Sequence, residues 1–150
     1  MWEEDYFILS AGVGTLGHSA WPRNGRAYVM YYGTSRFAAK QILDKAFRQS
    51  RRGIMLGAGV YVTRDIQKAC KYPLGVSNSK RRVLKVRVDV GKVKIIDQQD
   101  HPMQETWHTE HGYDTAWVPP GVDMVESNRQ ENFLFVFYSL SCRLNPSLGN

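Results

Sequence analysis

The sequence predicts a single α+β domain in which strands outnumber helices. Its 150 residues are 43% hydrophobic and 23% charged, which is enough apolar material for one core. Residues 36–50 carry apolar side chains at helical spacing, whereas residues 83–90 alternate strictly between apolar and polar. Residues 133–138 are a dense aromatic and aliphatic run typical of a buried strand. We therefore expect residues 1–150 to form one domain, with residues 1–26 as an N-terminal extension or loop.

The first elements follow a glycine-rich segment at residues 12–17. This segment matches GxGxxG, but a loop composition follows it instead of a helix, so we predict a loop and no dinucleotide fingerprint. Residues 27–32 read as a buried strand that runs into a tight turn at Gly33. Ser35 is the expected N-cap of an amphipathic helix over residues 36–50, with Phe37 among its apolar positions.

The middle of the chain predicts short strands separated by breaks. A glycine-interrupted apolar stretch, residues 54–62, ends in a strand, and Thr63 can cap a short helix that reaches Tyr72. The alternating strand 83–90 is followed by a second short strand at 92–96. Polar residues then predict a long connection over 97–125, a type of segment that often carries function.

Positive charge is concentrated in the central segment, residues 36–94. This segment has 16 basic and 3 acidic residues, a balance of 16 − 3 = +13, whereas the rest of the chain has 4 − 11 = −7. Such a segment favours an anionic ligand, namely nucleic acid, membrane phosphate, a dinucleotide or an acidic protein, and the alternative is a solvated basic face. RNA contact through this segment is therefore one prediction, with residues 51–52 and 80–82 as its densest clusters.

Cysteine and histidine usage argues against a disulfide framework and a metal site. Cys70 and Cys142 lie 72 positions apart, so we expect both thiols to be reduced and buried in an intracellular, cytoplasmic protein. His108 and His111 have no further ligand pair to complete a zinc set. No apolar run approaches the ~20 residues that span a bilayer, and we expect no membrane partner.

Three segments, in this order, resemble the ADP-ribosyltransferase domain of the poly(ADP-ribose) polymerase (PARP) family. They are Tyr-Tyr-Gly-Thr-Ser at 31–35, Gly-Ala-Gly-Val-Tyr at 57–61 continuing to Tyr72, and Glu-Asn-Phe-Leu-Phe at 131–135. Residues 112–116 are similar to the Tyr-Asp-Ser segment of mono-ADP-ribosylating members, and residues 55–65, 83–94 and 112–120 are similar to the small virus- and interferon-induced gene-two proteins of fish. The resemblance implies two packed antiparallel sheets, a split β-sheet core, with flanking short helices.

The resemblance also implies an NAD site. It assigns Tyr61 and Tyr72 to the two rings that enclose nicotinamide, and Gly33, with Thr34 beside it, to the backbone that holds the carboxamide. Glu131 matches the catalytic glutamate that stabilises positive charge on the ribose. An alternative register puts Phe133 at that position and leaves no carboxylate.

Two positions depart from the family pattern. Tyr32 stands where the family has a ribose-binding histidine, and Ala69 stands where a serine hydroxyl bonds the nicotinamide amide; losing that bond costs about 1 kcal/mol. With Tyr32 as a catalytic and NAD-binding candidate and Ala69 lining the site, the resemblance implies an NAD-dependent mono-ADP-ribosyltransferase of antiviral innate immunity. We expect such an enzyme to use NAD as its substrate, to need no metal and to modify a protein or nucleic-acid acceptor. The alternative is an inactive PARP-like pseudoenzyme or binding module that acts through protein or nucleic-acid contacts.

Overall fold

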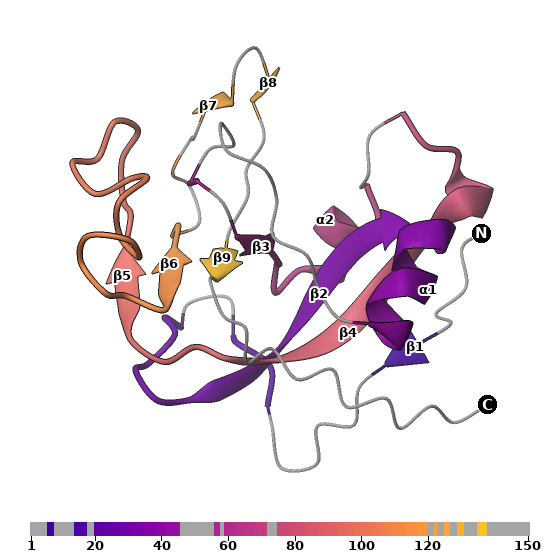
Figure 1. Cartoon of the computed structure of the whole chain (residues 1–150), viewed down its shortest axis with the longest axis horizontal. Coiled ribbons are helices and arrows are strands. Elements are labelled where there is room, and N and C mark those ends of the chain that lie inside the picture. Colours follow the sequence, from indigo (N-terminus) through magenta and orange to yellow (C-terminus); the bar gives the residue numbers. More distant parts are fainter. Residues whose placement is uncertain are drawn as a thin grey trace.

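The computed structural model describes residues 6–7, 14–17, 20–45, 56–57, 59–71, 75–119, 122, 125–126, 129–130 and 135–137. These ranges form an α+β fold, as predicted, built on two sheets with few helices (Figure 1). A separate two-stranded ladder pairs β7 (Val125–Glu126) with β8 (Arg129–Gln130). No helix within the described ranges is both long and apolar enough to cross a bilayer.

The first sheet has the strand order β1-β4-β2 and is dominated by one long ladder. The strands are β1 (Tyr6–Phe7), β4 (Arg81–Asp89) and β2 (Ala27–Ser35), and β2 pairs antiparallel with β4 along its whole length. The alternation predicted for β4 is confirmed, because Leu84, Val86 and Val88 are all buried. The turn predicted at Gly33 is wrong, since its pairing with Val83 keeps β2 extended to Ser35.

The second sheet has the order β3-β9-β6-β5 and is made of short strands. They are β3 (Val60–Tyr61), β9 (Phe135–Phe137), β6 (Thr115–Trp117) and β5 (Val93–Ile95). Strand β6 lies inside the stretch predicted to be a connection. All three of its residues are buried, so it shows no alternation that would reveal it in the sequence.

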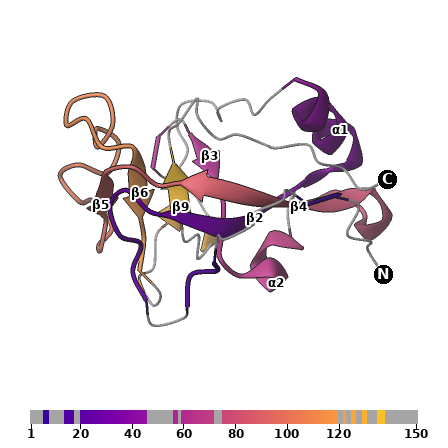
Figure 2. The ribbon, with the colours of Figure 1, turned by 90° about the horizontal axis from the view of Figure 1, so that it is seen from below.

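The expectation that both sheets are purely antiparallel is wrong. Strand β5 runs parallel to β6, and β1 runs parallel to β4. Parallel neighbours need a crossover of a dozen or more residues, and the loop between β5 and β6 is long enough to provide one. Figure 2 shows the strands of the second sheet running across the direction of β2 and β4.

One core cluster joins the two sheets. From the first sheet it takes Met30, Leu84, Val86 and Val88, and from the second Val60, Val62 and Trp117. A second cluster lies on the other face of the second sheet, where Ala116 and Val118 pack with Leu56, Ile96 and Trp107 of the flanking loops. The second sheet is therefore covered on both faces, which explains its uniformly buried β6.

Helix α1 (Arg36–Asp44) begins as predicted, because the Ser35 side chain accepts the Ala38 N–H at 3.1 Å. The described helix ends at Asp44, and the predicted remainder to residue 50 lies outside the described residues, apart from Lys45, which caps the helix. Ala39 packs into the core, but Phe37 is 71% exposed, so its predicted place on the apolar face is wrong. The two residues are two positions apart, which places Phe37 about 200° away from Ala39 around the helix axis.

Helix α2 (Ile66–Ala69) is shorter than predicted and has a different cap. The Asp65 carboxylate accepts the Gln67 N–H at 2.9 Å, and the Thr63 hydroxyl instead accepts the Asp65 N–H at 3.0 Å. Figure 2 shows α1 and α2 on opposite sides of the β2–β4 ladder. Cys70, which caps α2, is half-buried and not buried as expected, because it lies just beyond the packed turn; Cys142 lies outside the described residues.

Candidate active site at the junction of the two sheets

The two sheets meet where β2 passes the end of β3. Tyr31 and Thr63 form an antiparallel bridge, with the Tyr31 N–H donating to Thr63 O at 2.7 Å and the Thr63 N–H donating to Tyr31 O at 2.9 Å. Because the bridge is antiparallel, Gly33, two residues after Tyr31, and Tyr61, two residues before Thr63, lie on the same side of it, Gly33 on β2 and Tyr61 on β3. The backbone therefore brings Gly33 and Tyr61 to one junction.

The peptide groups of Gly33 point into this junction. Tyr31 directs its N–H and C=O toward Thr63, away from β4, and peptide groups repeat their direction every second residue of a strand. Gly33 therefore directs its own N–H and C=O toward the β3 side, while β4 pairs along the opposite edge of β2. A ligand at the junction would meet a backbone donor and acceptor with no Cβ beside them.

Tyr61 is held by its hydroxyl group. The hydroxyl accepts the Leu56 N–H at 3.1 Å and donates to Gly57 O at 2.7 Å. The ring is half-buried and packs against the second core cluster. Because these two bonds fix the far end of the side chain, the ring has a set orientation and offers a ligand its face rather than its hydroxyl.

Tyr32 points into the other core cluster, the one shared by the two sheets. Burial raises the pKa of its phenol above the usual value, and a hydrogen bond with the Thr34 side chain opposes this in part. Thr34 is itself buried and lies on the same face of β2. Tyr32 therefore stays protonated at neutral pH and can donate a hydrogen bond, but the structure does not bring its ring into the cluster that holds Tyr61.

The remaining predicted site residues divide between described and undescribed positions. Ala69 is buried in α2, which contacts β2. Tyr72, Glu131 and the alternative Phe133 lie outside the described residues, so the choice between the two registers stays a prediction.

Sequence reasoning missed a group of cations around α2. Arg64 lies over the Trp117 ring, 5.7 Å from its centroid, and donates to Gly17 O. Burial lowers the pKa of Lys68; Asp65 opposes this effect, whereas the nearby charges of Arg64 and Lys71 add to it. The spacing of these three cations, i, i+4 and i+7, is the signal that a net-charge count overlooks.

Asp114, in the segment that resembles the Tyr-Asp-Ser motif, has a structural role here. Its carboxylate accepts the Lys92 N–H at 2.8 Å, and its own N–H donates to Lys92 O at 2.8 Å. The Lys92 ammonium lies 4.6 Å from the centroid of the Tyr113 ring. These contacts join the start of β5 to the start of β6.

Comparison with known proteins adds no further assignment to this geometry. The chain matches no family model and no curated protein. In the part of the chain that the structure describes, no three His, Cys, Asp or Glu side chains gather as a metal site would require.

Proposed function

We propose that this protein is an NAD-dependent mono-ADP-ribosyltransferase with a PARP-type fold, and that NAD binds at the β2–β3 junction. The observation that carries the proposal is the Tyr31–Thr63 bridge, which has Gly33 of β2 and Tyr61 of β3 on the same side of it. These are the two residues that the resemblance assigns to the carboxamide and to one nicotinamide ring contact. They are 28 positions apart in the chain, so the fold, and not their sequence proximity, brings them near.

The junction suits the chemistry of nicotinamide. The Gly33 N–H and C=O can pair with the carboxamide oxygen and amine, because no side chain stands between them. The Tyr61 ring, fixed by its bonds to Leu56 and Gly57, can stack on the flat pyridinium without losing further side-chain freedom. The resemblance adds Tyr72 as the second ring, and Thr34 and Ala69 as neighbours of the site.

The cations of α2 suit the rest of the dinucleotide. Arg64, Lys68 and Lys71 lie on or beside a helix that contacts β2, and burial together with mutual repulsion lowers the pKa of Lys68. A pyrophosphate placed among them would relieve that repulsion and form charge-assisted hydrogen bonds. The site would thereby hold the nicotinamide end and the central pyrophosphate of NAD around the junction.

The proposed reaction transfers one ADP-ribose unit. The bond between the ribose C1′ and the nicotinamide nitrogen breaks, and its electron pair leaves with neutral nicotinamide. An acceptor oxygen, nitrogen or sulfur forms the new bond to C1′ and releases its proton to solvent or a base. Glu131 is the proposed carboxylate that accepts a hydrogen bond from a ribose hydroxyl and stabilises the positive charge at C1′. The resemblance to virus-induced fish proteins supports a role in antiviral innate immunity, and the cysteine usage supports a cytoplasmic location.

A second candidate function is a PARP-like pseudoenzyme that uses the same fold for binding alone. The burial of Tyr32 favours it, because the residue at the ribose-binding position packs into the core and pairs with Thr34. If that arrangement persists when ligand is present, the ribose loses the hydrogen bond that the family's histidine provides. The two candidates share the junction and differ in turnover.

Calorimetric titration with NAD and with a non-hydrolysable NAD analogue tests the proposal. We expect micromolar to low-millimolar binding that Tyr61→Ala abolishes and Tyr61→Phe retains in weakened form, since the second variant keeps the ring and loses only its two anchoring bonds. Circular dichroism of both variants controls for folding.

Glu131→Gln should bind NAD normally and lose automodification; unchanged automodification would mean that another residue is the catalytic carboxylate. Binding without transfer in the unmodified protein selects the pseudoenzyme. No binding at all contradicts the transferase and leaves a pseudoenzyme that acts through macromolecular contacts.

A further inference from the structure

One aromatic side chain stands in solvent at the start of α1. Phe37 is 71% exposed, the greatest exposure of any large hydrophobic residue that the structure describes. Its neighbours on the solvent side of the helix, Arg36, Lys40 and Gln41, are all exposed and polar. An isolated exposed phenylalanine is ordinary, but one surrounded by cations is a specific combination.

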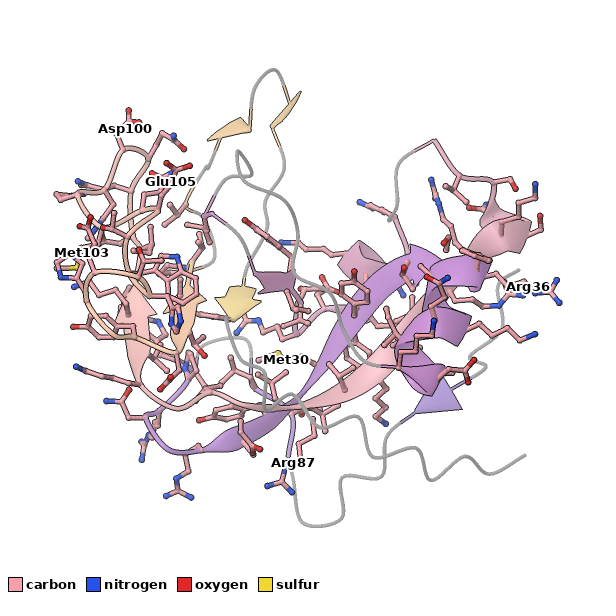
Figure 3. The ribbon with its side chains drawn as sticks, in the orientation of Figure 1. Met30, Arg36, Arg87, Asp100, Met103 and Glu105 are labelled. Carbon is pink, nitrogen blue, oxygen red and sulfur yellow. The ribbon has the colours of Figure 1, made fainter. Side chains whose placement is uncertain are left out.

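The ladder between β2 and β4 adds further cations to the same end of the first sheet. Ser35, which directly precedes Arg36, pairs with Arg81, and Thr34 pairs with Arg82. Lys80 ends the 3-10 helix η1 (Asn78–Lys80), which leads directly into β4. Figure 3 shows Arg36 projecting from α1 away from the sheet, at the opposite end of the molecule from Met103 and Asp100. We call Arg36, Phe37, Lys40, Lys80 and Arg81 the α1 surface.

Two hydrogen bonds hold Arg81 of this surface and the neighbouring Arg82 in place. Arg81 donates to the Asn78 side chain at 3.2 Å, and the neighbouring Arg82 donates to Ser79 O at 2.9 Å. Both therefore hold η1 against the start of β4. Arg36, Lys40 and Lys80 are all exposed, so an anion can reach their charges.

We propose that the α1 surface binds single-stranded nucleic acid, with one base stacked on Phe37 and the adjoining phosphates beside Arg36, Lys40 and Lys80. Proteins that bind single strands combine a positively charged track with an aromatic ring on which a base stacks. The surface has both features close together, because Phe37 lies in the first turn of α1 and Arg81 pairs with Ser35, the cap of that helix. The site is separate from the β2–β3 junction and does not depend on NAD binding.

The surroundings of Phe37 argue for this ligand over a membrane. A helix that lies on a bilayer presents a broad apolar face, whereas the apolar face of α1, with Ala39 and Ile42, is already buried in the core. Among the described residues, Phe37 thus offers one exposed ring beside cations, with no broad apolar face of α1 next to it. A stacked base needs only that ring, and its phosphates need the cations.

Fluorescence anisotropy with a labelled oligouridine of about 12 nucleotides, a length in the range of single-strand binding sites, tests the proposal. We expect the protein to bind this oligonucleotide with an affinity that falls as the salt concentration rises. Phe37→Ala and Phe37→Leu should weaken it by about 5- to 100-fold, since both remove the stacking face, whereas Phe37→Trp should preserve it. Arg36→Glu should weaken binding and lower the slope of log K against log salt by about 0.7 for each phosphate that Arg36 neutralises in the wild-type protein.

Arg26→Glu is the matched control for Arg36→Glu. Arg26 and Arg36 are both exposed arginines and flank the two ends of β2, so the strand holds them about 30 Å apart, and both substitutions change the net charge equally. Equal weakening by the two variants would overturn the proposal, because it would show an effect of net charge alone. The proposal would also be overturned if Phe37→Leu bound the oligouridine as well as the wild-type protein does, if the wild-type protein bound a duplex equally well, or if it did not bind the oligouridine at all. Stronger binding to anionic phosphatidylserine vesicles that depends on Phe37 would overturn it in favour of a membrane.

Discussion

The two sheets of this protein are held together in different ways. In the first sheet, β2 and β4 pair residue by residue over nine positions each. In the second, no strand among the described residues is longer than three residues, and side chains from loops help to hold the strands together. The first sheet is therefore stabilised mainly by a continuous backbone ladder, and the second by interactions between distant parts of the chain.

The hydrogen bonds of four side chains show how the second sheet is held. The Trp107 indole donates to Leu56 O at 2.9 Å, and the Tyr61 hydroxyl bonds the same short turn. The Asp114 carboxylate accepts the Lys92 N–H, and the Thr115 hydroxyl donates to Val90 O at 2.6 Å. Each of them crosses between segments, so removing one should loosen a strand that has few backbone bonds of its own.

This difference has a consequence for the candidate site. Gly33 belongs to the long ladder, whereas Tyr61 belongs to the short strands. A substitution that loosens the second sheet should therefore displace the ring of Tyr61 before it affects the backbone of Gly33. The following variants test the comparison, from the largest expected effect to the smallest.

Trp107→Ala should lower the free energy of unfolding most, by about 3–5 kcal/mol. Trp107 is 1% exposed, and its removal would leave a cavity in the second cluster and an unpaired Leu56 carbonyl. Urea unfolding followed by circular dichroism measures the change. Trp21→Ala is the control, because Trp21 is 55% exposed and its removal should cost less than about 0.5 kcal/mol. Similar destabilisation in the two variants would contradict the role given to Trp107.

Gly91→Ala should cost about 1–3 kcal/mol, more than Gly25→Ala. Both glycines have positive φ, 58° at Gly91 and 75° at Gly25, so both variants carry left-handed backbone strain. A Cβ at Gly91 would also overlap the Asp114 side chain, whereas one at Gly25 would meet nothing within 4 Å. The difference between the two melting temperatures thus measures the overlap with Asp114, and equal melting temperatures would mean that this side chain moves aside freely.

Tyr32→Phe should cost about 1 kcal/mol at pH 8, because it removes the hydrogen bond with Thr34. The folded-state pKa of Tyr32 is raised above its usual 10.0, so the unfolded chain releases this proton first as pH rises. The wild-type protein therefore loses stability above pH 10 in a way that the variant does not. We expect the difference in unfolding free energy between the two to shrink between pH 8 and pH 11. A constant difference would show that the phenol is as well solvated in the folded state as in the unfolded state.

Phe37→Ala should change the unfolding free energy least, by less than about 0.5 kcal/mol. The side chain is mostly exposed and belongs to neither core cluster. Thermal unfolding measures the effect. A decrease above about 1 kcal/mol would mean that Phe37 packs against another part of the chain, and it would then be unsuited to stacking a base.

The candidate site was predictable in part. Motif resemblance selected Gly33 and Tyr61, and the Tyr31–Thr63 bridge has both residues on the same side of it. The separation of Tyr32 from Tyr61 was not predictable, because it depends on which face of each strand packs against which cluster. The cations of α2 were visible as charges, but the packing of α2 against β2 was not.

The sequence by itself determined the α+β class, the alternating strand β4 and the Ser35 cap of α1. Each follows from residues that are close in the chain, where periodicity and a single side-chain bond decide local structure. Only the tertiary structure decided that β5 and β6 are parallel, that the Trp107 loop covers the second sheet and that Phe37 faces solvent. These features depend on packing between segments far apart in the sequence, and such packing leaves no periodic signal in either segment.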